Sequence, residues 1–148
     1  MRSRDHLVDL AMAERARELG ELIKTRPVRE DLGIEDQIVD VVAAMVELAG
    51  SDPEFTLLAQ SMPEEHAFEF MAGQSELTDV LEGVLEPYFD RARELGILRD
   101  ELGTHALTRW TQAVLASLRP RRGQPAEVTA AELRYFLIPA LIGPPSAR

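Results

Sequence analysis

The side chains best suited to bind a metal ion are three histidines, His6, His66 and His105. None has a second histidine three or four residues away, the spacing at which two imidazoles project from one helix face and bind zinc. None follows a glutamate by three residues, as the Glu-x-x-His pairs of a di-iron bundle require. We therefore interpret them as surface or half-buried histidines, and expect no metal ion and no cofactor.

Groups for covalent or phosphate chemistry are also missing from the sequence pattern. The chain contains no cysteine, so it has neither a thiol nucleophile nor a thiolate metal site. No serine stands in a Gly-x-Ser-x-Gly elbow, and the 9 glycines are scattered rather than gathered in a phosphate-binding loop. The acidic residues fall mainly on polar helix faces. The sequence alone does not exclude that folding brings two carboxylates together as a catalytic pair. We do not expect an enzyme.

Charge and composition limit the possible partners. The chain has 148 residues, a formal net charge of -10 and 45% hydrophobic residues, which suits one folded domain. A chain this negative is repelled by nucleic-acid phosphates. The short basic run Arg119, Arg121 and Arg122 is better explained as a solvated loop. No apolar stretch is long enough for a membrane span or a signal peptide, so we expect a cytoplasmic protein.

The middle of the chain is rich in methionine and aromatic side chains, which suit an adaptable pocket for a small apolar molecule. Two expected helices in this region are short and begin at prolines, and such helices pack less regularly than long ones. Thr111 and Gln112 could supply polar contacts in a cavity. The alternative is that these side chains only form the core. The predicted ligand-binding residues are Met45, Phe55, Met62, His66, Phe70, Tyr88, Phe89 and Trp110.

The elements that carry these residues are predicted to be α-helices only. Five β-branched residues between Ile38 and Val46 favour a strand locally, but the helical pattern persists for about four turns, longer than most strands. The fold class is therefore all-α, an antiparallel bundle of about seven helices. Apolar positions recur every three or four residues over 4–24, 34–49, 53–60, 64–72, 75–95, 104–118 and about 129–142.

Capping residues and prolines define the expected helix ends. Asp52 is predicted to cap the third helix, with Pro53 in its first turn. Ser61 and Thr129 are each followed three residues later by glutamate, which is typical of a capping box at a helix start. Pro87 is expected to bend the fifth helix without ending it, and Gly96 is expected to end that helix in the left-handed conformation.

The last two helices each carry a broad apolar face, and such a pair often associates with its copy as a four-helix bundle. The alternative is that both faces close the core of one chain. Small residues beside these faces, Ala106, Ala113, Ser117 and Ala140, would allow close approach. We predict a homodimer whose interface contains Leu107, Val114, Leu118, Leu133, Phe136, Leu137, Ala140 and Leu141.

The order of these signals resembles the C-terminal part of TetR-family transcriptional regulators. Residues 2–7 resemble the junction that follows the family's DNA-binding head, and Asp52-Pro53-Glu54-Phe55 resembles a common helix opening. Pro87, Arg91-Ala92 and residues 96–100 resemble the end of the long helix and its turn, and 107–118 with 133–141 resemble the dimerisation helices. The resemblance implies an effector-binding domain, a homodimer and a small hydrophobic effector that shifts the DNA affinity of helix-turn-helix heads.

One departure from the family is large, because no helix-turn-helix head precedes residue 1. We expect a single effector-binding and dimerisation domain over 1–148, with 4–24 as the linker helix from the missing head, 34–95 as pocket helices and 104–143 as dimerisation helices. Operator DNA would be bound only through that head. A misassigned start, a truncated gene and a separately produced domain all explain its absence. The alternative function is a stand-alone homodimeric interaction module without DNA binding.

Overall fold

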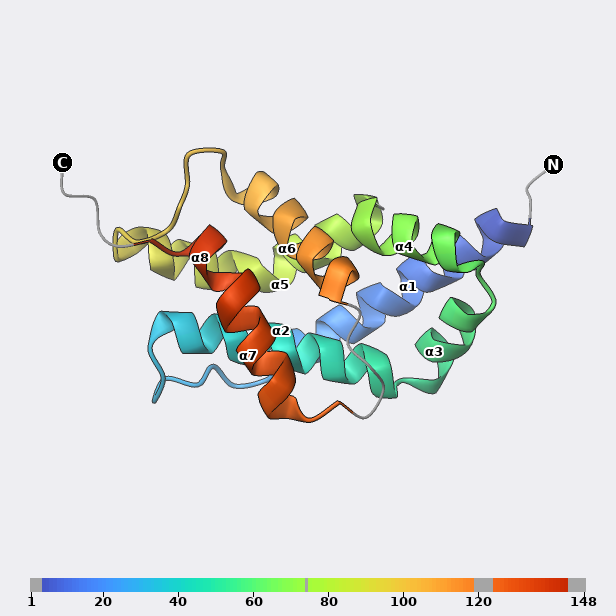
Figure 1. The fold of residues 1–148 in the computed structure, drawn as a ribbon, viewed down its shortest axis with the longest axis horizontal. Coiled ribbons are helices and arrows are strands. Elements are labelled where there is room, and N and C mark those ends of the chain that lie inside the picture. The colour runs from blue at the N-terminus through green and yellow to red at the C-terminus, as the bar shows by residue number, and fades with distance from the viewer. Residues whose placement is uncertain (1–3, 74, 119–123, 144–148) are drawn as a thin grey trace.

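Residues 4–73, 75–118 and 124–143, the part of the chain that the computed structural model describes, form α-helices joined by turns (Figure 1). The predicted all-α bundle is confirmed. The β-branched run lies inside one helix, since a four-turn apolar stripe outweighs local strand propensity. The helices are α1 (Arg4–Lys24), α2 (Ile34–Ser51), α3 (Pro53–Gln60), α4 (Glu64–Gly73), α5 (Ser75–Glu94), α6 (Thr104–Leu118), α7 (Ala126–Phe136) and α8 (Ile138–Leu141).

The predicted helix ends are confirmed in part. The Asp52 side chain accepts a hydrogen bond from the amide of Phe55 at 2.8 Å, as an N-cap does. α5 runs through Pro87 without a break. The capping box at Ser61 is wrong, because this residue ends α3 and its hydroxyl donates to the Leu58 carbonyl instead. Residue 50 lies inside α2, which continues to the Asp52-Pro53 junction.

The last predicted helix is divided and begins earlier than the sequence suggested. Thr129 lies inside α7 and accepts a hydrogen bond from Gln124 at 2.9 Å, so the capping box predicted there is also wrong. α7 ends at Phe136, Leu137 follows as its C-cap with φ -105°, and α8 starts with Pro139 in its first turn. Pro139 lies in the first turn of α8, where its missing N–H leaves no hydrogen bond unmade.

The buried side chains form two apolar clusters along the long axis of the molecule. The larger cluster joins α2 and α5 to α6, α7 and α8, with Phe89, Leu133, Leu137 and Leu141 fully buried. The smaller cluster joins α1, α3, α4 and the start of α5 around Met12. Leu48 of α2 packs against both clusters. No helix of the described residues is long and apolar enough to cross a membrane.

The turn between α5 and α6 is tied to the end of the described chain. Gly96 has φ +73° and Gly103 has φ +88°, and the left-handed conformation predicted for Gly96 is therefore confirmed. The Arg99 amide donates to the Leu141 carbonyl at 2.8 Å, and the Gly143 amide donates to the Ile97 carbonyl at 2.9 Å. These two backbone hydrogen bonds hold α8 beside the turn, which brings α8 next to the first half of α6.

Candidate functional site

The predicted ligand-binding residues are distributed over both clusters. Met45, Tyr88 and Phe89 lie in or against the larger cluster, whereas Phe55, Met62 and Phe70 belong to the smaller one. Burial raises the pKa of the half-buried Tyr88 above its usual value. His66 is half-buried, and its Nε2 lies 2.8 Å from Asp9 Oδ1. The structure does not gather these seven side chains around one cavity, and the eighth, Trp110, is half exposed on α6.

Most of the predicted interface residues are buried inside one chain. Leu107, Val114, Leu133, Leu137 and Leu141 all belong to the larger cluster, and Leu118 packs against it. They close the core of one chain, which is the alternative that the sequence left open for these positions. Of the predicted interface residues, Phe136 at the end of α7 and Ala140 in α8 remain accessible.

The accessible side of α6 carries a stripe of small residues interrupted by one large aromatic ring. Ala106, Trp110, Ala113 and Ser117 recur at spacings of four, three and four, which places them on one face of the helix. Leu107, which lies three residues before Trp110, also lines the groove beside this stripe but is buried. Three residues advance the helix by about 300°, so Trp110 is turned about 60° from Leu107 toward solvent. Trp110 is consequently 50% exposed and Leu107 is buried.

The α6 stripe borders a groove with a volume of about 540 Å³. This volume lies within the range of small-molecule sites. Its apolar lining comes from α6, from Leu102 in the turn before α6, and from Ala72 and Ala140 at the ends of α4 and α8. The full lining is Ala72, Arg99, Glu101, Leu102, Ala106, Leu107, Arg109, Trp110, Ala113 and Ala140.

Three charged residues stand at this groove. The Arg99 Nε donates to the Pro139 carbonyl at 2.8 Å, and its guanidinium packs so closely on Gly143 that an added Cβ there would lie 2.9 Å from Arg99 Cζ. Arg99 is thus held in place. Arg109 and Glu101 are exposed, and among the described residues neither forms an ion pair. The groove therefore combines an apolar lining with a local excess of one positive charge.

A second apolar surface, the α7 ridge, consists of Val128, Tyr135 and Phe136. Their exposed fractions are 45%, 77% and 52%, and the Tyr135 and Phe136 rings contact each other edge to face, with centroids 5.0 Å apart. Val128 and Tyr135 are seven residues apart and so share one face, directed away from the buried Leu133. Phe136 precedes the groove residue Ala140 by four positions. The ridge thus ends at the α7–α8 junction, and the groove residue Ala140 lies in the next helix.

A strong electrostatic contact joins α1 to the junction of α2 and α3. Arg15 binds both carboxylate oxygens of Asp52, with Nε–Oδ2 and Nη2–Oδ1 distances of 3.0 and 2.5 Å. Arg15 and the amide of Phe55 both stabilise the carboxylate, so the pKa of Asp52 is lowered, the Arg15 hydrogen bonds being the larger cause. The same contact raises the pKa of Arg15. Asp52 thus caps α3 and binds α1 at once.

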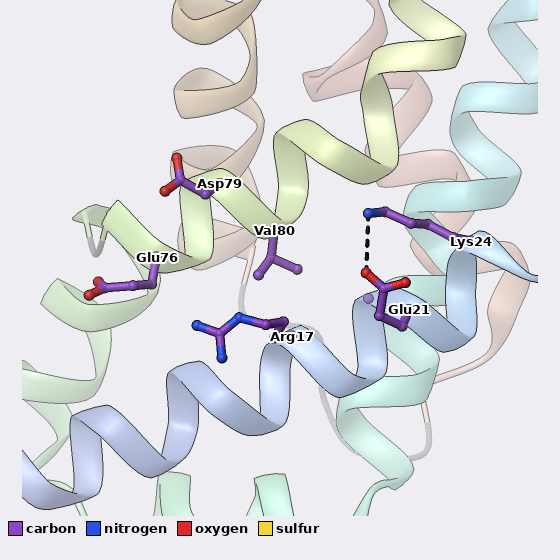
Figure 2. A pocket seen from close by; sticks show the side chains of 7 residues that line it. Arg17, Glu21, Lys24, Glu76, Asp79 and Val80 are labelled. Atoms are coloured by element: carbon purple, nitrogen blue, oxygen red, sulfur yellow. Dashed lines mark hydrogen bonds and ion pairs between the residues drawn. The ribbon is translucent and has the colours of Figure 1, made fainter.

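A smaller, charged hollow lies between α1 and α5. It has a volume of about 230 Å³, and Figure 2 shows Val80 directed from α5 toward α1, with Lys24 bound to Glu21. The helices approach closely there, because a Cβ added at Gly20 would lie 2.7 Å from Val80 Cγ1. Its mixed charges select no one class of ligand. The lining is Arg17, Gly20, Glu21, Lys24, Glu76, Asp79 and Val80.

The histidines and the basic run are the other sequence features considered for binding. Within the described residues, no three histidine or acidic side chains are grouped so as to hold a metal ion. The basic run Arg119, Arg121 and Arg122 lies outside the described residues, as do residues 1–3 of the proposed head junction. The sequence did not single out Leu102, Arg109, Val128 or Tyr135 as site residues, and Arg99 entered only as part of the motif at residues 96–100.

Comparison with known proteins supplies no relative. Neither the chain nor its fold significantly matches any of the protein-family models, curated proteins or solved structures against which they were compared. The groove and the α7 ridge are therefore interpreted from their own geometry and chemistry.

Proposed function

We propose that this chain is the effector-binding and dimerisation domain of a TetR-like transcriptional regulator. The observation that carries the proposal is that the C-terminal helices present two accessible apolar surfaces, the α6 groove and the α7 ridge. Sequence motifs resembling the family stand where the all-α bundle begins α3 and ends α5. In this proposal a small apolar effector occupies the groove, the α7 ridge joins two copies, and α1 connects the domain to a helix-turn-helix head encoded upstream.

The α7 ridge is suited to contact a second copy. Its three bulky side chains, Val128, Tyr135 and Phe136, lie within one 11-residue helix and are 45–77% exposed. Large exposed apolar patches commonly mark interaction surfaces. A two-fold axis beside α7 would place the ridge against itself, so that one patch serves both subunits. Aromatic side chains are enriched at the centres of such interfaces.

Light scattering tests the homodimer. We expect a mass near twice 16.5 kDa for the unmodified chain and near 16.5 kDa for Tyr135→Glu/Phe136→Glu, because the new carboxylates of both copies would be buried against one another in the interface. Leu22→Glu is the control, since Leu22 is an exposed leucine on α1, away from the ridge. A dimer that survives the double substitution would place the interface elsewhere, and a monomeric unmodified chain would remove dimerisation from the proposal.

Two measurements test the remaining parts. The in-frame codons upstream of residue 1 should encode a helix-turn-helix; a stop codon directly before residue 1 would favour the stand-alone interaction module instead. Trp110 is the single tryptophan of the chain, so its fluorescence reports on the groove alone. We expect the emission to shift when a neutral apolar compound such as 1-octanol is added. If alcohols with shorter and longer hydrocarbon chains also left the Trp110 emission unchanged, the effector site would be refuted.

A further inference from the structure

We propose that the groove beside Trp110 selects a monocarboxylate with an apolar tail over an uncharged apolar molecule. This inference rests on the proposed function, because it takes the groove as the ligand site, and it adds the chemical class of the ligand. It starts from a contrast in charge. The whole chain has a net charge of -10, yet two arginines and one glutamate stand at this groove, giving it a local charge of +1.

The two arginines line the same groove and are held differently. Arg99 is fixed by the hydrogen bond from its Nε to the Pro139 carbonyl and by its packing on Gly143, and within the described residues its two outer nitrogens donate no hydrogen bond. Arg109 lies one residue before Trp110 on α6 and forms no ion pair within the described part of the chain. A guanidinium matches the two oxygens of a carboxylate with parallel N–H donors. The arginines therefore provide an anion-binding rim that needs no rearrangement of Arg99.

The rest of the groove suits a hydrocarbon tail. Trp110 and Leu102 supply large exposed apolar surfaces, and the alanines at 106, 113 and 140 leave the space between them. Covering such surface with a tail removes apolar area from water on both molecules, which is favourable. Glu101 at the rim opposes a dianion such as a phosphate monoester. The combination favours one negative charge on an apolar body of modest length.

The test compares ligands that share a tail and differ in headgroup. Octanoate, 1-octanol and acetate are titrated into the whole chain, with Trp110 emission as the readout. We expect octanoate to bind about three- to fivefold more tightly than 1-octanol at low salt, as an exposed ion pair provides. We expect that advantage to shrink as sodium chloride screens the charges. Acetate should leave the Trp110 emission unchanged at concentrations at which octanoate saturates the groove.

Three variants locate the headgroup. Arg99→Gln and Arg109→Gln should each lower octanoate affinity about threefold and leave 1-octanol affinity unchanged. Gly143→Ala should displace the Arg99 guanidinium without removing its charge, and so should weaken octanoate binding in the same selective way. Arg4→Gln removes the same charge from an exposed position at the start of α1 and is the matched control, for which we expect no change with either ligand.

Each other result has a definite meaning. Equal affinities for octanoate and 1-octanol, equal losses in Arg4→Gln and Arg109→Gln, or tight acetate binding would overturn the charge selection while leaving the apolar effector site intact. No emission change with any ligand would overturn the effector site as well. If Trp110→Ala converts a dimer into a monomer, a second copy of the chain fills the groove, and the carboxylate proposal is wrong.

Discussion

The contact between Arg15 and Asp52 allows a quantitative test of how α1 is attached to the bundle. Asp52 is 7% exposed, and its carboxylate is shared between the Phe55 amide, which it caps, and the Arg15 side chain. Two substitutions separate these roles. Asp52→Asn keeps the shape and can still cap α3, but it removes the charge. Asp52→Ala removes both the cap and the charge.

The expected losses of unfolding free energy follow from those roles. Losing an N-cap costs about 1 kcal/mol. Losing a hydrogen bond to a charged group costs about 1.5–3 kcal/mol, and we take the lower end because 23% of the Arg15 side chain is exposed. Asp52→Ala should therefore lose about 2–3 kcal/mol in total. Asp52→Asn should lose about 1 kcal/mol less than Asp52→Ala, because its amide oxygen still caps α3.

Thermal unfolding followed by circular dichroism measures these differences. For a chain of this size, about 1 kcal/mol corresponds to about 2–4 °C in Tm, so Asp52→Ala should unfold about 5–10 °C below the unmodified chain. In an Arg15→Gln background, Asp52→Asn should cost much less than it does alone, because the partner is gone. If Asp52→Asn and Asp52→Ala had the same Tm, the cap would contribute nothing. If the two single losses simply added in the double variant, the ion pair would not stabilise α1.

Three further predictions use the same measurement. The pKa of Asp52 is lower in the folded chain than its usual value of 3.8, so the stability that its carboxylate adds to the fold should be complete above about pH 5 and lost as the pH falls through the native pKa. The Tm difference between the unmodified chain and Asp52→Asn should therefore vanish in acid. A difference that stays constant with pH would contradict the ion pair. Leu137→Ala should lower the free energy of unfolding by about 2–5 kcal/mol because Leu137 is fully buried. Phe136→Ala should leave the Tm of the monomer nearly unchanged because Phe136 is 52% exposed. Similar losses in the two variants would mean that Leu137 is not a core residue. Gly20→Ala should destabilise the chain by about 1–3 kcal/mol because the added Cβ would meet Val80. Adding Val80→Ala to this variant should restore most of the lost stability. If it restores none, α1 and α5 do not approach each other closely at this position.

Local sequence signals were sufficient for most of the helices. The four-turn stripe of α2 predicted a helix despite its β-branched residues, and Asp52-Pro53 defined the start of α3. The errors occurred where two signals competed over a few residues. Thr129 has a capping-box sequence but lies inside α7, and Ser61 ends α3 instead of beginning α4. Side chains near a helix end can bond to several backbone groups, and the surrounding turns decide which bond forms.

The candidate site was predictable only in part, because exposure depends on which helices become neighbours. The sequence singled out Trp110 and the small residues at 106, 113 and 140, and all four line the groove. It could not place Arg99 there, because hydrogen bonds between the α5–α6 turn and the end of the chain bring that residue to α8. It also assigned Leu137 to an interface, because a broad apolar face looks the same whether it covers its own core or a partner.

The sequence by itself thus determined the all-α class, the absence of cysteine chemistry and most helix positions, since periodicity and capping act within a few turns of the chain. The tertiary structure alone decided that the leucines of α6 and α7 close one core and that Trp110, Tyr135 and Phe136 remain outside it. The physical reason is that burial is a property of pairs of surfaces. Which side of an amphipathic helix stays in contact with water is fixed only when its neighbours are in place.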